Sequence, residues 1–146
     1  MLYIMITFAY INKKIEIMKA NELRIGNLVS HYSFEGYYHT VIGIKPNGIV
    51  ILEMPTGFGE LHAADSEPIT LTEEWLLKFG FEKKIWKVKK SIYFELDKIE
   101  ILLEDSYYKN GVTYFKSNML FEYFPKYVHQ LQNLYFALTN EELKII

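Results

Sequence analysis

The sequence predicts an α+β fold in which two groups of short antiparallel strands are joined by one helix and followed by another. Three observations lead to this prediction. Segments rich in β-branched and aromatic residues, separated by Gly, Pro and Asn, recur through residues 23–64 and again through 85–124. Apolar residues at helical spacing occupy residues 73–79 and 127–138. Half of the 146 residues are apolar, which suits a packed core and excludes disorder as the main state.

The first strand group predicts an SH3-like small antiparallel β-barrel. Glu35-Gly36 and Pro46-Asn47-Gly48 are turn signals, because Gly tolerates positive φ and Pro presets the first central position of a turn. Short, evenly spaced strands joined by tight turns are typical of barrels that close their own edges. The expected strands cover residues 23–29, 31–34, 37–42, 49–54 and 60–63, with a loop over 55–59.

A short helix over Glu73–Phe79 is expected to close one end of the barrel and to join the two halves of the chain. Thr72 suits the N-cap, where its hydroxyl accepts from free backbone N–H groups. Glu73 and Glu74 favour the positive end of the helix dipole, and Gly80 suits the left-handed position that ends a helix.

The second strand group predicts an antiparallel β-meander. Asn110-Gly111, lying between aromatic segments, indicates a type I′ hairpin. Pro125 is expected to end the last strand. The other expected strands cover Ile85–Val88, Ile92–Leu96, Ile99–Leu103 and Leu120–Phe124.

The C-terminal helix, expected over Tyr127–Leu138 and packed on the meander, has an unusual second face. One face is an apolar stripe that includes Val128 and Leu131. The opposite face carries no charged residue, whereas a solvated helix face is mostly charged. Asn140 either stops the helix in the left-handed region or belongs to a capping box that opens one more turn. The face is formed by His129, Gln130, Gln132, Asn133, Phe136 and Ala137.

Composition argues against several classes of function. The absence of cysteine excludes a disulfide scaffold, a zinc ribbon and a thiol nucleophile. A net charge of −2 argues against a dominant electrostatic grip on nucleic acid or on an anionic membrane. The only Arg is Arg24, and Arg is the preferred residue for bidentate contacts to phosphate and guanine.

No pattern in the sequence indicates catalysis, so we expect a protein that is not an enzyme and that carries no cofactor or metal. An enzyme of unknown type is kept as an alternative. His31 and His39 flank one hairpin, but no convincing third ligand accompanies them. Gly57-Phe58-Gly59 lacks the strand and helix that flank a phosphate-binding loop. No Gly-x-Ser-x-Gly pattern is present.

Two groups of residues are candidates for binding a protein partner or a second copy of the chain. The first is an aromatic hairpin, in which alternate rings point to opposite faces, and its alternative role is to cover a small core. The second is part of the uncharged helix face, for which burial within the same chain is the alternative. The residues are Tyr32, Phe34, Tyr37 and Tyr38 on the hairpin, and His129, Gln132, Asn133 and Phe136 on the helix.

A basic ribbon supports a different function, weak and sequence-independent binding of nucleic acid. Lysines interleaved with a Trp can hold single strands by charge and stacking. Lysines also protect exposed strand edges from aggregation, which is the alternative role. The ribbon consists of Lys83, Lys84, Trp86, Lys87, Lys89 and Lys90.

Three motifs resemble an uncharacterised family of small proteins from Bacteroidetes-type bacteria, their prophages and phages. They are NELRIGN at Asn21–Asn27, LTEEWLLKFGF at Leu71–Phe81 and VHQLQNLYFALT at Val128–Thr139, the last being the most specific. The resemblance spans about residues 18–146, and family members usually carry Gly at the position of Asn140. It implies a mobile-element origin and assigns neither an activity nor a catalytic residue.

The expected organisation has three parts, and we expect a cytoplasmic protein. Residues 18–82 form the barrel with its short helix, and residues 83–146 form the meander with its helix. Residues 1–17 contain an apolar run that is too short for a membrane span, which needs about 20 apolar residues. The positive charges follow this run, unlike those of a signal peptide.

Residues 1–17 are either an extra strand or helix packed on the domain, or an extension from a start codon assigned too early. We favour the second alternative because family members begin at the position of Met18. The intact mass of the natively expressed protein tests this expectation. A mass that includes residues 1–17 would contradict it.

Overall fold

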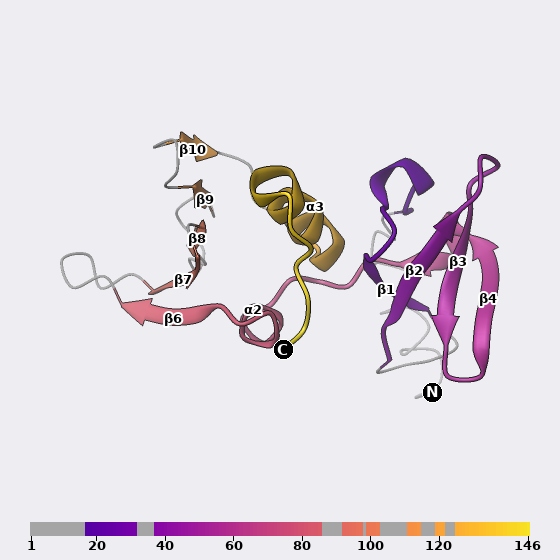
Figure 1. The fold of residues 1–146 in the computed structure, drawn as a ribbon, viewed down its shortest axis with the longest axis horizontal. Coiled ribbons are helices and arrows are strands. Elements are labelled where there is room, and N and C mark those ends of the chain that lie inside the picture. The colour runs from indigo at the N-terminus through magenta and orange to yellow at the C-terminus, as the bar shows by residue number, and fades with distance from the viewer. Residues whose placement is uncertain are drawn as a thin grey trace, which may run out of the picture.

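The structure is a computed structural model that describes residues 17–31, 37–85, 92–97, 99–102, 111–114, 119–121 and 125–146. Two antiparallel sheets lie on either side of the helices α2 (Glu73–Lys78) and α3 (Val128–Thr139) (Figure 1). The C-terminal segment returns along α3 and ends beside α2, where the Ile146 N–H donates to the Lys78 carbonyl over 3.0 Å. The predicted α+β class is therefore confirmed.

The first sheet is curled into a half-barrel of five strands in the order β4-β3-β2-β1-β5. β1 pairs antiparallel with both β2 and β5, so it connects the meander β2-β3-β4 to the short last strand. A 3₁₀ turn, η2 (Ala63–Asp65), leads from β4 into β5. The strands are β1 (Leu28–His31), β2 (His39–Ile44), β3 (Ile49–Met54), β4 (Gly57–His62) and β5 (Ser66–Glu67).

The expected loop over residues 55–59 is wrong, because β4 begins at Gly57. Gly57 pairs with Met54, and Gly59 pairs with Leu52. Pro55 and Thr56 alone make the turn. Two glycines suggest a loop by propensity, yet Gly57 tolerates its φ of 134° and lets the strand begin directly after the turn.

The predicted signals at both ends of α2 and at the C-terminal end of α3 are confirmed. The Thr72 hydroxyl accepts from the Trp75 N–H over 3.5 Å, and Gly80 has a φ of 85°. At the start of α3, the side chain of Gln130 accepts from the backbone N–H groups of Lys126 and Tyr127. Asn140 has a φ of 61° and stops α3, so of the two roles left open for it the helix stop is correct.

The second sheet is a meander in which consecutive strands are neighbours, in the order β10-β9-β8-β7-β6. Its first strand begins at Glu82, three residues before the predicted start. Asn110, in the predicted type I′ hairpin, lies outside the described residues, whereas β9 after it pairs with β8 and β10. The strands are β6 (Glu82–Ile85), β7 (Ile92–Leu96), β8 (Ile99–Leu102), β9 (Gly111–Tyr114) and β10 (Met119–Phe121).

Two separate apolar cores meet at β1. Because side chains alternate along a strand, Val29 faces the interior of the half-barrel while Leu28 faces the helices. The half-barrel core is formed by Met18, Leu23, Val29, Val41, Val50, Leu52 and Ala63. β1 is thus a wall shared by both cores.

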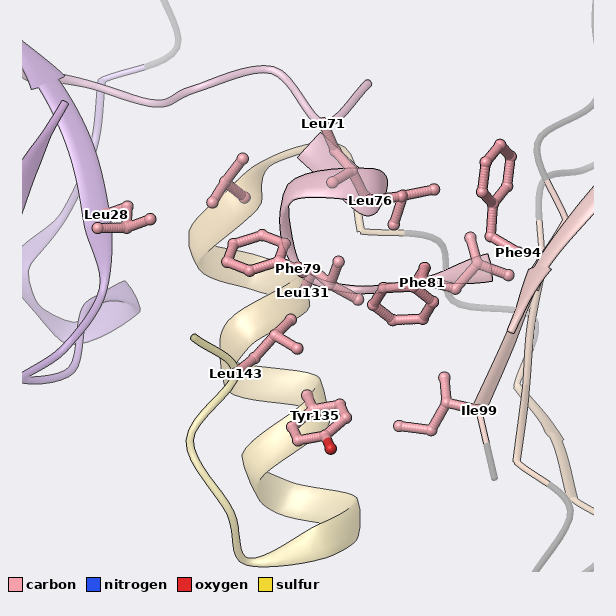
Figure 2. Close-up of a cluster of buried hydrophobic side chains, with 12 residues drawn as sticks. Leu28, Leu71, Leu76, Phe79, Phe81, Phe94, Ile99, Leu131, Tyr135 and Leu143 are labelled. Carbon is pink, nitrogen blue, oxygen red and sulfur yellow. The ribbon is translucent and has the colours of Figure 1, made fainter. Parts of the chain in front are cut away.

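The second core lies between α2, α3 and the second sheet, where Leu76, Phe79 and Phe81 share one buried cluster with Leu131 and Tyr135 (Figure 2). The expectation that the short helix closes the barrel is therefore wrong. Its buried side chains belong to this core, because Gly80 and Phe81 connect α2 directly to β6 and keep the helix beside the second sheet.

Tyr135 joins α3 to the second sheet. Its hydroxyl donates to Asp97 Oδ2 over 2.8 Å, at the turn between β7 and β8. Burial, followed by the hydrogen bond to Asp97, raises the pKa of Tyr135 to about 12. The folded state therefore holds a proton that the unfolded chain releases near pH 10.

This contact predicts a stability loss in alkaline solution. The stabilisation that the Tyr135 contact contributes is fully present below about pH 10. It is lost as the pH rises toward about 12, at up to ~1.4 kcal/mol per pH unit. Urea unfolding at several pH values should show a steeper fall for the native protein than for Tyr135→Phe. The Tyr37→Phe variant, changed at an exposed tyrosine, should follow the native curve. Equal slopes for native protein and Tyr135→Phe would contradict the assignment.

Candidate binding surface

The predicted helix face lies against the chain itself, with Gln132 at its centre. Gln132 Oε1 accepts from the Leu28 N–H over 2.8 Å, and Gln132 Nε2 donates to the Gly26 carbonyl over 3.1 Å. The Leu28 N–H belongs to β1 and the Gly26 carbonyl to the turn just before it, beyond the reach of β5, which pairs only with Ser30 and His31. The side-chain amide therefore takes the place of a neighbouring strand's peptide group. Gln132 is 2 % exposed.

The residues beside Gln132 also contact the segment that leads into β1. Asn133 Oδ1 accepts from Asn27 Nδ2 over 3.0 Å, while its Nδ2 donates to the Glu22 carbonyl over 2.8 Å. The Phe136 ring lies under the guanidinium of Arg24, 3.6 Å from its centroid. Arg24 in turn pairs with Glu142 over 3.0 Å.

His129 is likewise inside the molecule, 1 % exposed and stacked on Tyr127 with 5.8 Å between ring centroids. The uncharged face does meet protein, but the protein is this chain, so Gln132 and His129 are not available to a partner. This corrects the expectation for Gln132 and His129, whereas Asn133 and Phe136 remain partly exposed. One sequence signal was available, because Asn27 in the first motif and Asn133 in the third are complementary amides.

The aromatic hairpin is different, because its described rings are on the surface. Tyr37 is 67 % exposed and Tyr38 is 45 % exposed, while Tyr32 and Phe34 lie outside the described residues. Tyr38 makes an edge contact with Trp75 of α2, with 5.3 Å between centroids. Trp75 rests in turn on Phe79 at 5.8 Å. The second core thus supports the Tyr38 ring through Trp75.

Three pockets share Tyr38 as a wall. The first, of about 410 Å³, extends along β2 and β3 to Glu53. The second, of about 300 Å³, is mainly apolar and lies between Leu28 and the C-terminal residues 142–145. The third, of about 330 Å³, lies between Tyr37 and Trp75 and is called the Trp75 pocket below. Its lining is formed by Ser30, Tyr37, Tyr38, Glu67, Pro68, Ile69, Glu74, Trp75 and Lys78.

Trp75 is one of the apolar residues at helical spacing in residues 73–79, and the sequence alone does not mark it for binding. In the structure it is partly exposed, and Lys78 Nζ lies 4.8 Å from its ring centroid. Lys78 also bonds Glu74 over 2.8 Å and thereby holds the pKa of Glu74 below its usual value. The sequence carried one signal for this arrangement, because residues three and four apart on a helix are neighbours and Lys78 follows Trp75 and Glu74 at these spacings.

The described part of the basic ribbon is paired with acidic residues. Lys83 Nζ bonds Glu73 over 2.8 Å, and Lys84 Nζ bonds Glu95 and lies 3.6 Å from Glu82. These contacts reduce the positive charge offered to a nucleic acid. Trp86, Lys87, Lys89 and Lys90 lie outside the described residues.

Comparisons with protein-family models, with curated protein sequences and with solved structures find no match to this chain. Within the described ranges, no three His, Asp or Glu side chains gather in a way that could hold a metal ion. None of the helices described here has the length and apolarity that a membrane span requires.

Replacing Gln132 tests its role inside the fold. Gln132→Ala should lower the free energy of unfolding by about 2–4 kcal/mol, because it leaves a buried N–H and a carbonyl without partners. Asn133→Ala, at a half-exposed site, should cost about 1 kcal/mol. Denaturant unfolding measures both. A Gln132→Ala cost no larger than that of Asn133→Ala would show that the amide does not replace a strand.

Proposed function

We propose that this protein is a non-catalytic binding module that engages a protein partner through the surface around Tyr37, Tyr38 and Trp75. The exposure of Tyr37 and Tyr38 beside three pockets is the observation that carries the proposal. Aromatic rings that are rigidly supported and solvent-exposed supply large contact area at low entropic cost. Large exposed apolar groups beside hollows are typical of interaction sites.

The half-barrel supports a finer proposal, that the first sheet is of SH3-like type. The order β4-β3-β2-β1-β5 and the 3₁₀ turn Ala63–Asp65 between β4 and β5 favour it. Barrels of this type recognise extended peptides in grooves lined by aromatic residues. The origin in a phage or mobile element rests on the motif resemblance alone.

The proposal predicts that binding depends on Tyr37. Proteins captured from host lysate by the full chain should be lost with Tyr37→Ala, and affinity for a purified captured protein should fall about 30-fold, the scale of an interface hot spot. Quantitative mass spectrometry and titration calorimetry measure the two effects. Tyr37 is chosen because its exposure makes an effect on folding small, which the melting temperature checks.

Phe58→Ala is the matched control. Phe58 is a 70 % exposed aromatic on β4 that lines none of the three pockets around Tyr38. This variant should keep the captured proteins and their affinities. If the native protein, Tyr37→Ala and Phe58→Ala all captured the same proteins, a binding role for the surface would be contradicted.

A further inference from the structure

We infer that the Trp75 pocket binds a cationic side chain, Arg or Lys, from an extended segment of the protein partner. This inference rests on the proposed binding function and assigns the chemistry of the group that enters the pocket. Its support comes from the rings that form the walls, from the charges at the rim and from a cation of the chain itself that already lies there.

The walls offer aromatic faces to a cation. Tyr37, Tyr38 and Trp75 line the pocket together, and Tyr38 meets Trp75 at an interplanar angle of 73°. Rings that meet at a steep angle form two adjoining walls. The negative faces of such rings attract an ammonium or a guanidinium, with Trp the strongest of them.

The charged groups among the described lining residues are net negative. Glu67 and Glu74 carry two negative charges, and Lys78 carries one positive charge. Lys78 pairs with Glu74, whereas no ion pair joins Glu67 to a described Lys, Arg or His. Glu67 therefore keeps a carboxylate for an incoming cation, and the described lining residues retain a charge of −1 with Lys78 in place.

Lys78 shows that this environment accepts a cation. Its ammonium lies over the Trp75 ring and bonds the Glu74 carboxylate, which are the two kinds of contact expected for a ligand side chain. The pocket has a volume of about 330 Å³, roughly that of eleven water molecules at ~30 Å³ each. That space suits one long side chain.

The neighbouring pocket explains why the cation would come from a peptide. Tyr38 lines both the Trp75 pocket and the mainly apolar pocket beside Leu28, Leu143 and Ile145. An extended segment that passes Tyr38 can place a basic side chain in one pocket and an apolar one in the other. Two pockets of different chemistry that share one ring therefore favour a peptide over a free small cation.

Selection from a random peptide library against the immobilised full chain tests the inference. We expect selected peptides to share an Arg or Lys at one position. Replacing that residue by a neutral analogue, citrulline for Arg or norleucine for Lys, should weaken binding about tenfold. Glu67→Gln should weaken the basic peptide by a similar factor and leave the neutral peptide unchanged.

Two further variants sharpen the result. Lys78→Gln removes the cation already in the pocket, so affinity for the basic peptide should rise about threefold, whereas a purely apolar pocket would show no gain. Glu141→Gln makes the same charge change as Glu67→Gln at an exposed carboxylate outside the three pockets, and it should have no effect.

The outcomes separate this inference from the proposed function. Peptides that need Tyr37 but bind equally well with the neutral analogue would overturn the cation site and leave the binding function standing. Peptides that bind regardless of Tyr37, or a selection that yields no binding peptide, would contradict the inference. Capture from lysate that does not depend on Tyr37 would contradict the binding function as well.

Discussion

The amide of Gln132 is the contact on which the arrangement of this molecule depends. Its oxygen and nitrogen bond the Leu28 N–H and the Gly26 carbonyl, and its nitrogen also lies 3.4 Å from the Leu143 carbonyl. One side chain thus joins α3, the edge of β1 and the returning C-terminal segment. A buried edge needs partners for its peptide groups, because an unpaired buried N–H or carbonyl costs free energy. The short β5 leaves these backbone groups without partners, and Gln132 of α3 supplies the hydrogen bonds.

The same contact explains how the two sheets are held together. With α3 fixed to β1, Leu28 joins the core formed by the helices and the second sheet, while Val29 remains in the half-barrel core. The Arg24 guanidinium, between Phe136 and Glu142, extends this joint toward solvent. The three motifs of the resemblance meet here and in the second core. They therefore build the framework of the protein.

The surface around Tyr38 follows from this framework. α2 belongs to the second core, yet it lies close enough to the half-barrel for Trp75 to meet Tyr38. The Trp75 pocket is formed where the two halves of the fold come together, with residues from β1, β5 and α2. Pockets between structural units are common binding sites, because the units supply walls that a single sheet does not have. We therefore place the proposed function at this junction.

The amino-acid sequence by itself determined the local structure: both helices, the Thr72 cap, the Asn140 stop and most strands follow from side-chain period and backbone preference, which act over a few residues. It also identified Tyr37 and Tyr38 as candidate binding residues. Only the tertiary structure decided what the uncharged face of α3 contacts and which residues complete the aromatic surface. Gln132 and Gly26 are 106 residues apart, and the contact between Tyr38 and Trp75 also joins the two halves of the fold. An uncharged helix face has the same sequence pattern whether it binds a partner or its own chain, since both remove it from water.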